Sequence, residues 1–272
     1  SQRSMTICYD ASDEDDMSFL MGIGCGGTIY ILLQPLTAAN NYLQLPTICT
    51  ALESRQTCVF LQKITDHGEV AEAKVVGQDS DNFSAITQQL DSKKSRLMMV
   101  DDHTWLATTM KPPFHLLIVG GGVDARPLAS LAATLGWEIT LCDPRPANAR
   151  REHFMRVTTI LRCPPLQLTD EPLFKTFDAA IVMTHNLQLD ANAVAALQTS
   201  PIKYLALLGP IVRRGQVLEL ADLDKNNLLV PIAGPAGLRL GGELPEDIAL
   251  SILAECQAVI NGKDANSISN LL

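Results

Sequence analysis

The residues best suited to chemistry form a glycine-rich loop near the middle of the chain. The pattern Gly120-x-Gly122-x-x-Ala125 follows a short apolar run, His115–Val119, and precedes a helix-like stretch at 124–135. Here the first glycine permits a tight turn, the second lets the backbone approach a pyrophosphate, and the alanine allows close helix packing. The start of the helix would offer free N–H groups to phosphate. The pattern predicts a nucleotide-like ligand, with a Rossmann scaffold whose crevice is empty or repurposed as the alternative.

An acidic residue stands where a second ligand contact is expected. Asp143 follows Gly120 by 23 residues, at the end of the next strand-like run. In dinucleotide-binding domains an acidic side chain at this place accepts the ribose hydroxyls and disfavours a 2′-phosphate, although the nearby Arg145 favours one. The loop and Asp143 together predict NAD(P) or another nucleotide as a cofactor.

Two later strand ends carry further candidates. His185 follows the apolar run 179–183 and suits a general acid/base or a ligand-orienting donor, or else a structural or merely exposed histidine. Gly209 follows the run 203–207, and Arg213 with Arg214 just behind it would hold an anion or lie on a solvated helix face.

A second glycine-dense loop, which contains Gly234 and Gly237, precedes the helix start Pro245-Glu246-Asp247. Proline and acidic residues are typical of a first helical turn. The loop would offer N–H groups to an anion, or it is a plain connection.

The cysteines suggest one reactive thiol and a reducing compartment. Cys25 lies between Gly24 and Gly26, so its thiol is unshielded and local N–H groups would lower its pKa. We interpret it as a reactive or sulfur-contacting thiol, with a cysteine tucked into a turn as the alternative. The seven cysteines are widely spaced and include no C-x-x-C pair, which predicts no metal site and a cytoplasmic protein with free thiols.

Length and charge limit the class of protein. The chain has 272 residues, a hydrophobic content of 47% and a formal net charge of −9. This is enough for one large domain or two domains with their own cores. Proteins that track phosphate chains are usually basic, so nucleic acid and anionic membranes are not expected partners. The longest apolar runs are of strand length, well short of the roughly 20 residues of a membrane-spanning helix.

We place a domain boundary at Lys111-Pro112-Pro113, because adjacent prolines cannot continue a strand ladder. After this point the expected strands and helices alternate. We expect a smaller α+β domain at 1–111 and a Rossmann-like domain at 112–272, an α/β fold whose parallel sheet has helices on both faces. The second domain's expected strands are His115–Val119, Glu138–Cys142, 157–161, 179–183 and 203–207, and its expected helices are 124–135, 190–197, 213–220 and 245–259. The first domain's expected elements are a buried strand at Thr28–Leu33, a helix at 38–52 interrupted by Pro46, strands at 58–64 and 70–76, a helix at 82–89 and a hairpin of 96–100 with 104–109.

Several of these motifs, taken in order, resemble the XdhC/CoxI family of accessory factors for molybdenum hydroxylases such as xanthine dehydrogenase. The matching segments are 22–27 with the strand that follows, 118–125, 143–146, 183–190, 208–210, 234–241 and 245–255. Two departures are evident: Gly237-Leu238-Arg239 replaces a Gly-Leu-Asp triplet, and the family's upstream Ser-Gly-Gly-Cys-type segment is absent. The resemblance therefore implies either a shortened first domain or one whose start is missing.

The resemblance also implies a function. Such a protein would be a chaperone, usually a homodimer, that binds molybdenum cofactor (molybdopterin), protects it during sulfuration and delivers it to the apo-hydroxylase, with a cysteine desulfurase as a further partner. By this resemblance Cys25 contacts the cofactor or its sulfur chemistry. Two other functions stay open: an NAD(P)-dependent oxidoreductase with His185 as its acid/base, and a non-catalytic interaction or nucleotide-sensing module.

Overall fold

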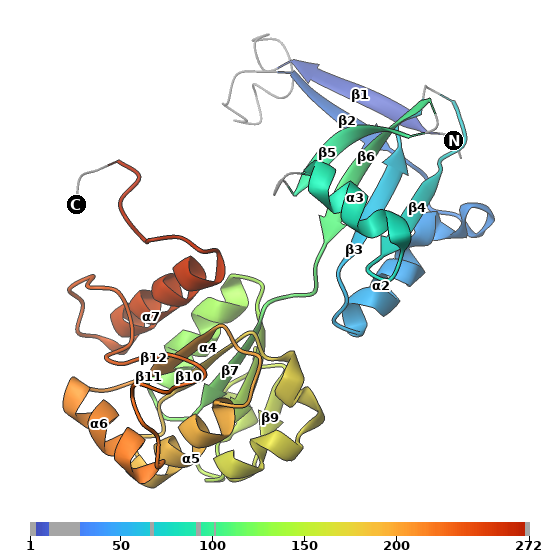
Figure 1. The fold of residues 1–272 in the computed structure, drawn as a ribbon. Helices are drawn as coiled ribbons and strands as arrows, with labels where there is room; N and C mark the ends of the chain where they lie inside the picture. The colour runs from blue at the N-terminus through green and yellow to red at the C-terminus, as the bar shows by residue number, and fades with distance from the viewer. Residues whose placement is uncertain (1–3, 11–27, 66–67, 91–93, 101, 270–272) are drawn as a thin grey trace. The chain divides into compact units, whose positions relative to one another are not determined.

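The computed structural model describes residues 4–10, 28–65, 68–90, 94–100 and 102–269. The chain forms two compact units, residues 1–112 and 113–272, whose junction lies between Pro112 and Pro113 (Figure 1). No helix among the described residues has the length and apolar composition needed to cross a bilayer.

The second unit is built on a six-stranded parallel sheet. Its strands are β7 (His115–Val119), β8 (Glu138–Cys142), β9 (Thr159–Leu161), β10 (Ala179–Val182), β11 (Tyr204–Leu207) and β12 (Ile232–Ala233). They lie in the order β12-β11-β10-β7-β8-β9. The order reverses between β7 and β10, which is the Rossmann arrangement, and ligands of such sheets bind at this switch point. The predicted Rossmann-like fold is confirmed.

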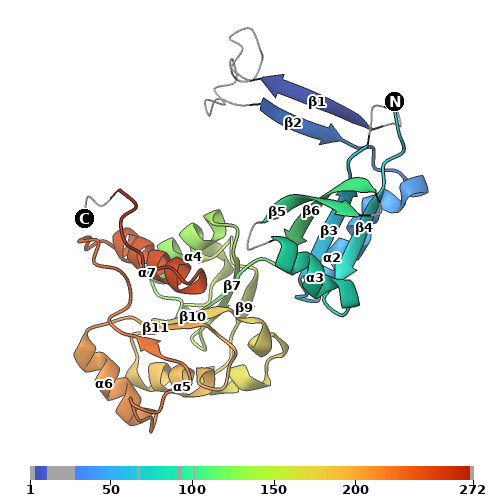
Figure 2. The same ribbon diagram turned by 45° about the horizontal axis from the view of Figure 1, so that its top comes forward.

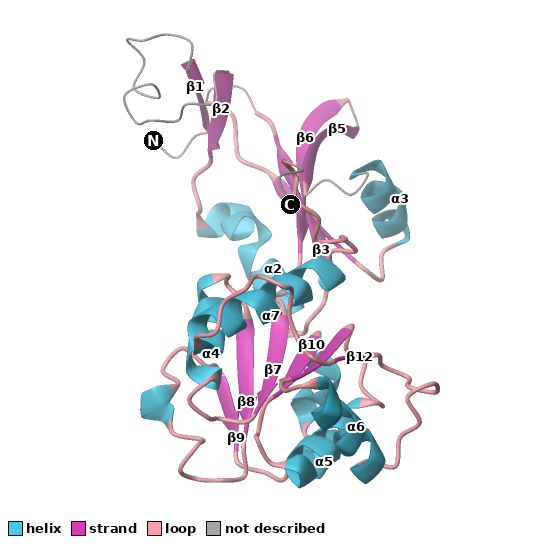
Figure 3. Cartoon of the chain, turned by 90° about the vertical axis from the view of Figure 1, so that its left-hand side faces the viewer, coloured by secondary structure: helices cyan, strands magenta, loops and turns pink. Residues whose placement is uncertain are grey.

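Helices cover both faces of this sheet, as its buried and largely apolar central strands require (Figure 3). Helices α4 (Ala125–Thr134) and α7 (Pro245–Ile260) pack on one face, and α5 (Leu187–Leu197) with α6 (Ile211–Leu220) packs on the other. Short 3₁₀ turns also belong to this unit: η2 (Arg151–His153), η3 (Pro165–Asp170) and η4 (Pro172–Thr176).

The pairing register aligns the carboxyl ends of the central strands. Val119 pairs with Cys142 on one side and with Val182 on the other, and Val182 in turn pairs with Leu207. The loops that follow β7, β8, β10 and β11 therefore leave the sheet side by side, along one edge.

The first unit contains a four-stranded antiparallel sheet in the order β4-β3-β6-β5. Its strands are β3 (Cys58–Lys63), β4 (Ala73–Gly77), β5 (Ser95–Val100) and β6 (His103–Met110). Helix α3 (Asp81–Leu90) packs on one face and η1 (Ala38–Gln44) with α2 (Leu45–Glu53) on the other. The expected helix at 38–52 is thus two helices, because residues 41–44 have positive φ and Pro46 lies in the first turn of α2.

A separate two-stranded ribbon is formed by β1 (Met5–Asp10) and β2 (Thr28–Leu33), seen apart from the larger sheet in Figure 2. The expected strand at Thr28–Leu33 exists, but the prediction that it is buried is wrong. Its side chains are mostly exposed, with 71% of Tyr30 accessible, because β1 is its only partner among the described strands.

Candidate functional site

The loop after β7 is shaped by two glycines that the protein's own backbone requires. Gly120 has a φ of +116°, and a Cβ there would lie 2.5 Å from the carbonyl oxygen of Met183, which directly follows β10. A Cβ on Gly121 would lie 2.6 Å from the carbonyl oxygen of Asn148. Side chains at these two positions would collide with backbone, so both glycines serve close packing between the loop and its neighbours.

Gly122 is different, because space remains beside it. A Cβ there would meet only Cδ2 of His185, at 3.8 Å. Among the described residues, the amides of Gly122, Val123 and Asp124 have no hydrogen-bond acceptor. These three N–H groups stand at the start of α4, where the helix dipole favours an anion. Ala125 follows as the first residue of α4 and is fully buried in the core, as close helix packing requires.

Asp143 supports this loop from inside the protein. Its Oδ2 accepts hydrogen bonds from the amide of Gly121 (2.8 Å), Nη2 of Arg145 (2.8 Å) and Nδ2 of Asn148 (3.1 Å). Its Oδ1 accepts from the amide and Nε of Arg145, both at 2.9 Å. The carboxylate is fully buried, and these bonds occupy its lone pairs. In this structure the side chain of Asp143 holds the loop, and its expected contact with a ribose hydroxyl stays a prediction.

Hydrogen bonding decides the charge of Asp143. Burial alone would raise the pKa of its carboxyl, but the donors on Arg145, Gly121 and Asn148 outweigh burial and hold that pKa below its ordinary value. The same carboxylate raises the pKa of Arg145. Both groups are therefore charged at neutral pH.

His185 lies across the switch point from the loop. Its backbone is left-handed, with a φ of +58°, and 59% of its side chain is exposed. Its Nε2 lies 3.0 Å from Oδ2 of Asp124, just before α4. The pair borders the open side of Gly122, so an imidazole able to donate or accept a proton lies beside the free amides.

Besides Asp143 and Arg145, a second buried carboxylate and its arginine lie near His185. Asp190 is fully buried, and its Oδ1 accepts from the amide (3.1 Å) and hydroxyl (2.6 Å) of Thr184. Its Oδ2 accepts from Nη2 of Arg213 at 2.5 Å. Nη2 of Arg145 also donates to the Thr184 carbonyl, at 3.0 Å. A chain of polar contacts thus joins the ends of β8 and β10 to α6. Arg213 neutralises Asp190, and its expected contact with an external anion stays a prediction.

The later glycines are closely packed. A Cβ on Gly209 would lie 2.6 Å from Cδ of Arg213, and one on Gly234 would lie 3.2 Å from Cδ of Arg214. Gly237 has a φ of +101° and packs against α7, where its amide donates to Oε2 of Glu255 at 2.8 Å. Gly209 and Gly234 follow strands β11 and β12 at the same edge as the β7 loop.

Not every predicted site residue can be placed. Gly24, Cys25 and Gly26 lie outside the described residues. The structure joins Gly120, Gly122, Asp143 and His185 at one switch point. Sequence reasoning gave no site role to Thr184 or Asp124. The signal that could have found them was position, since both stand within a residue or two of a strand end or a helix start.

Comparisons with known proteins agree with this geometry. Residues 116–256 match the family model of the XdhC Rossmann domain. A Bacillus subtilis protein, named as one of the subunits of a probable xanthine dehydrogenase, is 28% identical over 270 residues, covering 93% of this chain and 75% of its own. The Escherichia coli protein YqeB, described as uncharacterized, is 31% identical over 156 residues, covering 56% of this chain and 28% of its own.

One solved structure is similar to this chain over both units. The crystal structure of a xanthine dehydrogenase from Bacillus halodurans superposes with a TM-score of 0.73 at 25% identity, and covers 99% of this chain and 79% of its own. The family model spans more than half of the 272 residues and includes the whole switch point. The chain belongs to the XdhC family.

Proposed function

We propose that this protein binds molybdenum cofactor and assists its sulfuration and insertion into a xanthine dehydrogenase-type hydroxylase. The observation that carries the proposal is the open backbone at Gly122 within a chain of the XdhC family. The names of the two Bacillus relatives, both of which refer to xanthine dehydrogenase, support the choice of client. The hydroxylase and a cysteine desulfurase would be its partners, and a homodimer its working form.

The free amides fit the charged part of such a cofactor. Molybdopterin carries a phosphate, and the N–H groups of Gly122, Val123 and Asp124 would hold that group at the helix start. His185 and Asp124 would orient a polar group or move a proton beside it. The redox chemistry that the cofactor supplies belongs to the hydroxylase, so the residues of this chain bind, orient and protect. Cys25 would contribute the thiol for sulfur chemistry.

The test is retention of molybdenum cofactor by the purified full chain, measured as bound pterin and molybdenum after gel filtration. The wild type is expected to retain about one equivalent. Gly122→Val places a branched side chain over the free amides and is expected to abolish retention. Gly215→Val is the matched control, because Gly215 has no atom within 4 Å of its Cβ position and lies on the exposed side of α6. Failure of the wild type to retain the cofactor contradicts the proposal.

An NAD(P)-dependent oxidoreductase is the second candidate, favoured by the His185 imidazole beside Gly122. The occupied oxygens of Asp143 weigh against it, because they offer no acceptor to the ribose. The discriminating measurement is NADH fluorescence. An enhancement that saturates in the wild type and vanishes in Gly122→Val favours this candidate over the chaperone.

A further inference from the structure

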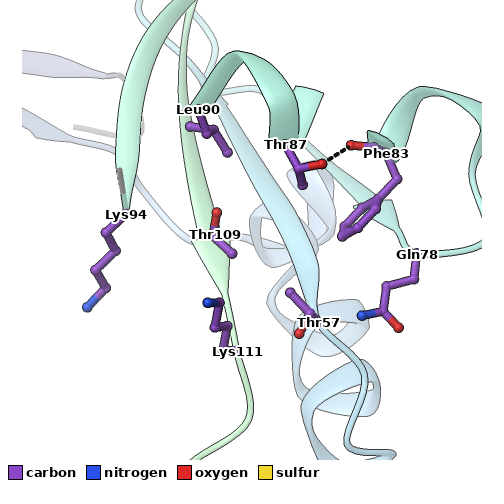
Figure 4. Close-up of a pocket in the computed structure, with 8 residues that line it drawn as sticks. All are labelled: Thr57, Gln78, Phe83, Thr87, Leu90, Lys94, Thr109 and Lys111. Carbon is purple, nitrogen blue, oxygen red and sulfur yellow. Dashed lines mark hydrogen bonds between the residues drawn. The ribbon is translucent and has the colours of Figure 1, made fainter. Parts of the chain in front are cut away.

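A pocket in the first unit lies between α3 and one end of the four-stranded sheet (Figure 4). It is an open pocket of about 590 Å³, within the usual range of sites for small organic ligands. Phe83 and Leu90 of α3 supply its apolar lining, and Lys94 and Lys111 line it from the sheet.

The strand register explains why polar residues gather here. Val59, Val76 and Ala107 belong to the core beneath α3, so every second residue along these strands faces the helix. Cys58 is the last paired residue of β3, opposite Gly77 of β4 and Met110 of β6. One residue further along the same register, Thr57 lies opposite both Gln78 and Lys111. At this end the face below α3 thus changes from apolar to polar.

The two lysines are neighbours on this face. The amide of Thr109 donates to the carbonyl of Lys94 at 2.9 Å, which places these residues opposite each other. Lys111 lies two residues beyond Thr109, so it is the diagonal neighbour of Lys94, at about 7–8 Å between backbones. Of the residues described as lining the pocket, none is an aspartate or glutamate, although the whole chain has a net charge of −9.

Uncharged donors stand beside the lysines. In the described part of the chain, the side chains of Thr57, Gln78 and Thr109 have no hydrogen-bond partner. The hydroxyl of Thr87 is engaged, since it donates to the carbonyl of Phe83 at 2.9 Å (Figure 4). The pocket thus combines two positive charges, two free hydroxyls and an amide with an aromatic side wall.

We propose that this pocket binds a small phosphate-bearing heterocycle, whose phosphate lies between Lys94 and Lys111 and whose ring packs against Phe83. A phosphate monoester carries a charge of about −1.5 to −2 at neutral pH, which matches the two ammonium groups. Lysine binds phosphate as a point charge, and the threonine hydroxyls and the glutamine amide supply directional hydrogen bonds. The site lies wholly within residues 1–112 and does not depend on the function proposed above.

The experiment is a titration of the full chain with adenosine 5′-monophosphate, followed by the NMR signals of methyl-labelled threonines. Binding shifts the signals of Thr57 and Thr109, with a dissociation constant of about 1 mM or below. Lys94→Gln and Lys111→Gln each weaken binding about fivefold, as expected for one exposed charge-assisted contact. Adenosine, which lacks the phosphate, and inorganic phosphate, which lacks the ring, bind more weakly than the nucleotide.

The matched control is Lys63→Gln, which removes an equal charge from the same sheet. Lys63 lies outside the pocket and 3.7 Å from Glu72, so this variant is expected to bind like the wild type. Thr57 and Thr109 line this pocket, so their signals report nucleotide that is bound within it. Unshifted threonine signals, equal binding of adenosine, or unchanged affinity in both lysine variants overturns the proposal.

Discussion

The carboxylate of Asp143 accepts a 2.8 Å hydrogen bond from the amide of Gly121, which ties the loop after β7 to the end of β8. The loop that presents the free amides is therefore fixed by a buried charge behind it. A site held in this way is formed before any ligand arrives, which lowers the entropy cost of binding.

Asp143→Asn is expected to destabilise the protein by about 2 kcal/mol, because it leaves the Arg145 guanidinium without its counter-charge in a partly buried place. Urea unfolding followed by circular dichroism measures the change. Asp124→Asn is the control, since its partner His185 is more than half exposed and the pair is worth about 0.5 kcal/mol. Equal losses in the two variants would show that Asp143 does not hold the loop.

The three glycines of the loop are expected to differ in their tolerance of a methyl group. Gly120→Ala and Gly121→Ala each force a Cβ against backbone and cost about 2 kcal/mol or more. Gly122→Ala meets only the edge of His185 and changes stability by less than about 1 kcal/mol. Thermal unfolding of the three variants checks the order. If Gly122→Ala lowered the unfolding temperature as much as Gly121→Ala, the space beside Gly122 would not be open.

The contribution of Asp143 to stability is expected to depend on pH. Its pKa is lower in the folded protein than in the unfolded chain, so the folded state favours the charged form. The stabilisation is complete above an unfolded pKa of about 3.9 and is lost as the pH falls through the folded value. The stability gap between wild type and Asp143→Asn should thus be full at pH 7 and shrink below about pH 4. Urea unfolding at several pH values measures it, and a constant gap is the contrary result.

Cys25→Ala is expected to lower activation of the partner hydroxylase without lowering the unfolding temperature. Its thiol stands between two glycines, with no bulky neighbour in sequence to shield it. The measurement is hydroxylase activity after incubation with cofactor-loaded protein. Cys49→Ala, which removes an exposed thiol of α2, serves as the control and should leave activation unchanged. Unchanged activation by Cys25→Ala would demote this cysteine to a structural thiol.

Much of the second unit could be predicted from local pattern. Largely apolar runs such as His115–Val119 predict strands correctly, because a parallel strand covered on both faces buries nearly all of its side chains. The two-residue strand β12 was missed, since Ile232–Ala233 is too short to show any periodicity. In the first unit, Thr28–Leu33 has the composition of a buried strand, yet only packing decides whether another layer covers it.

Glycine spacing and hydrophobic period are local properties, so the amino-acid order was enough to indicate the family, the Rossmann-like fold and the positions of Gly120, Gly122, Asp143 and His185 at strand ends. What those side chains contact depends on the folded molecule. Asp143 turns inward to Gly121, and Arg213 turns to Asp190, because a buried charge must find its counter-charge and donors within the protein. Lys94 and Lys111 likewise become neighbours only through the pairing of β5 with β6. Such pairing joins residues that are distant in the chain, so no local sequence pattern indicates it.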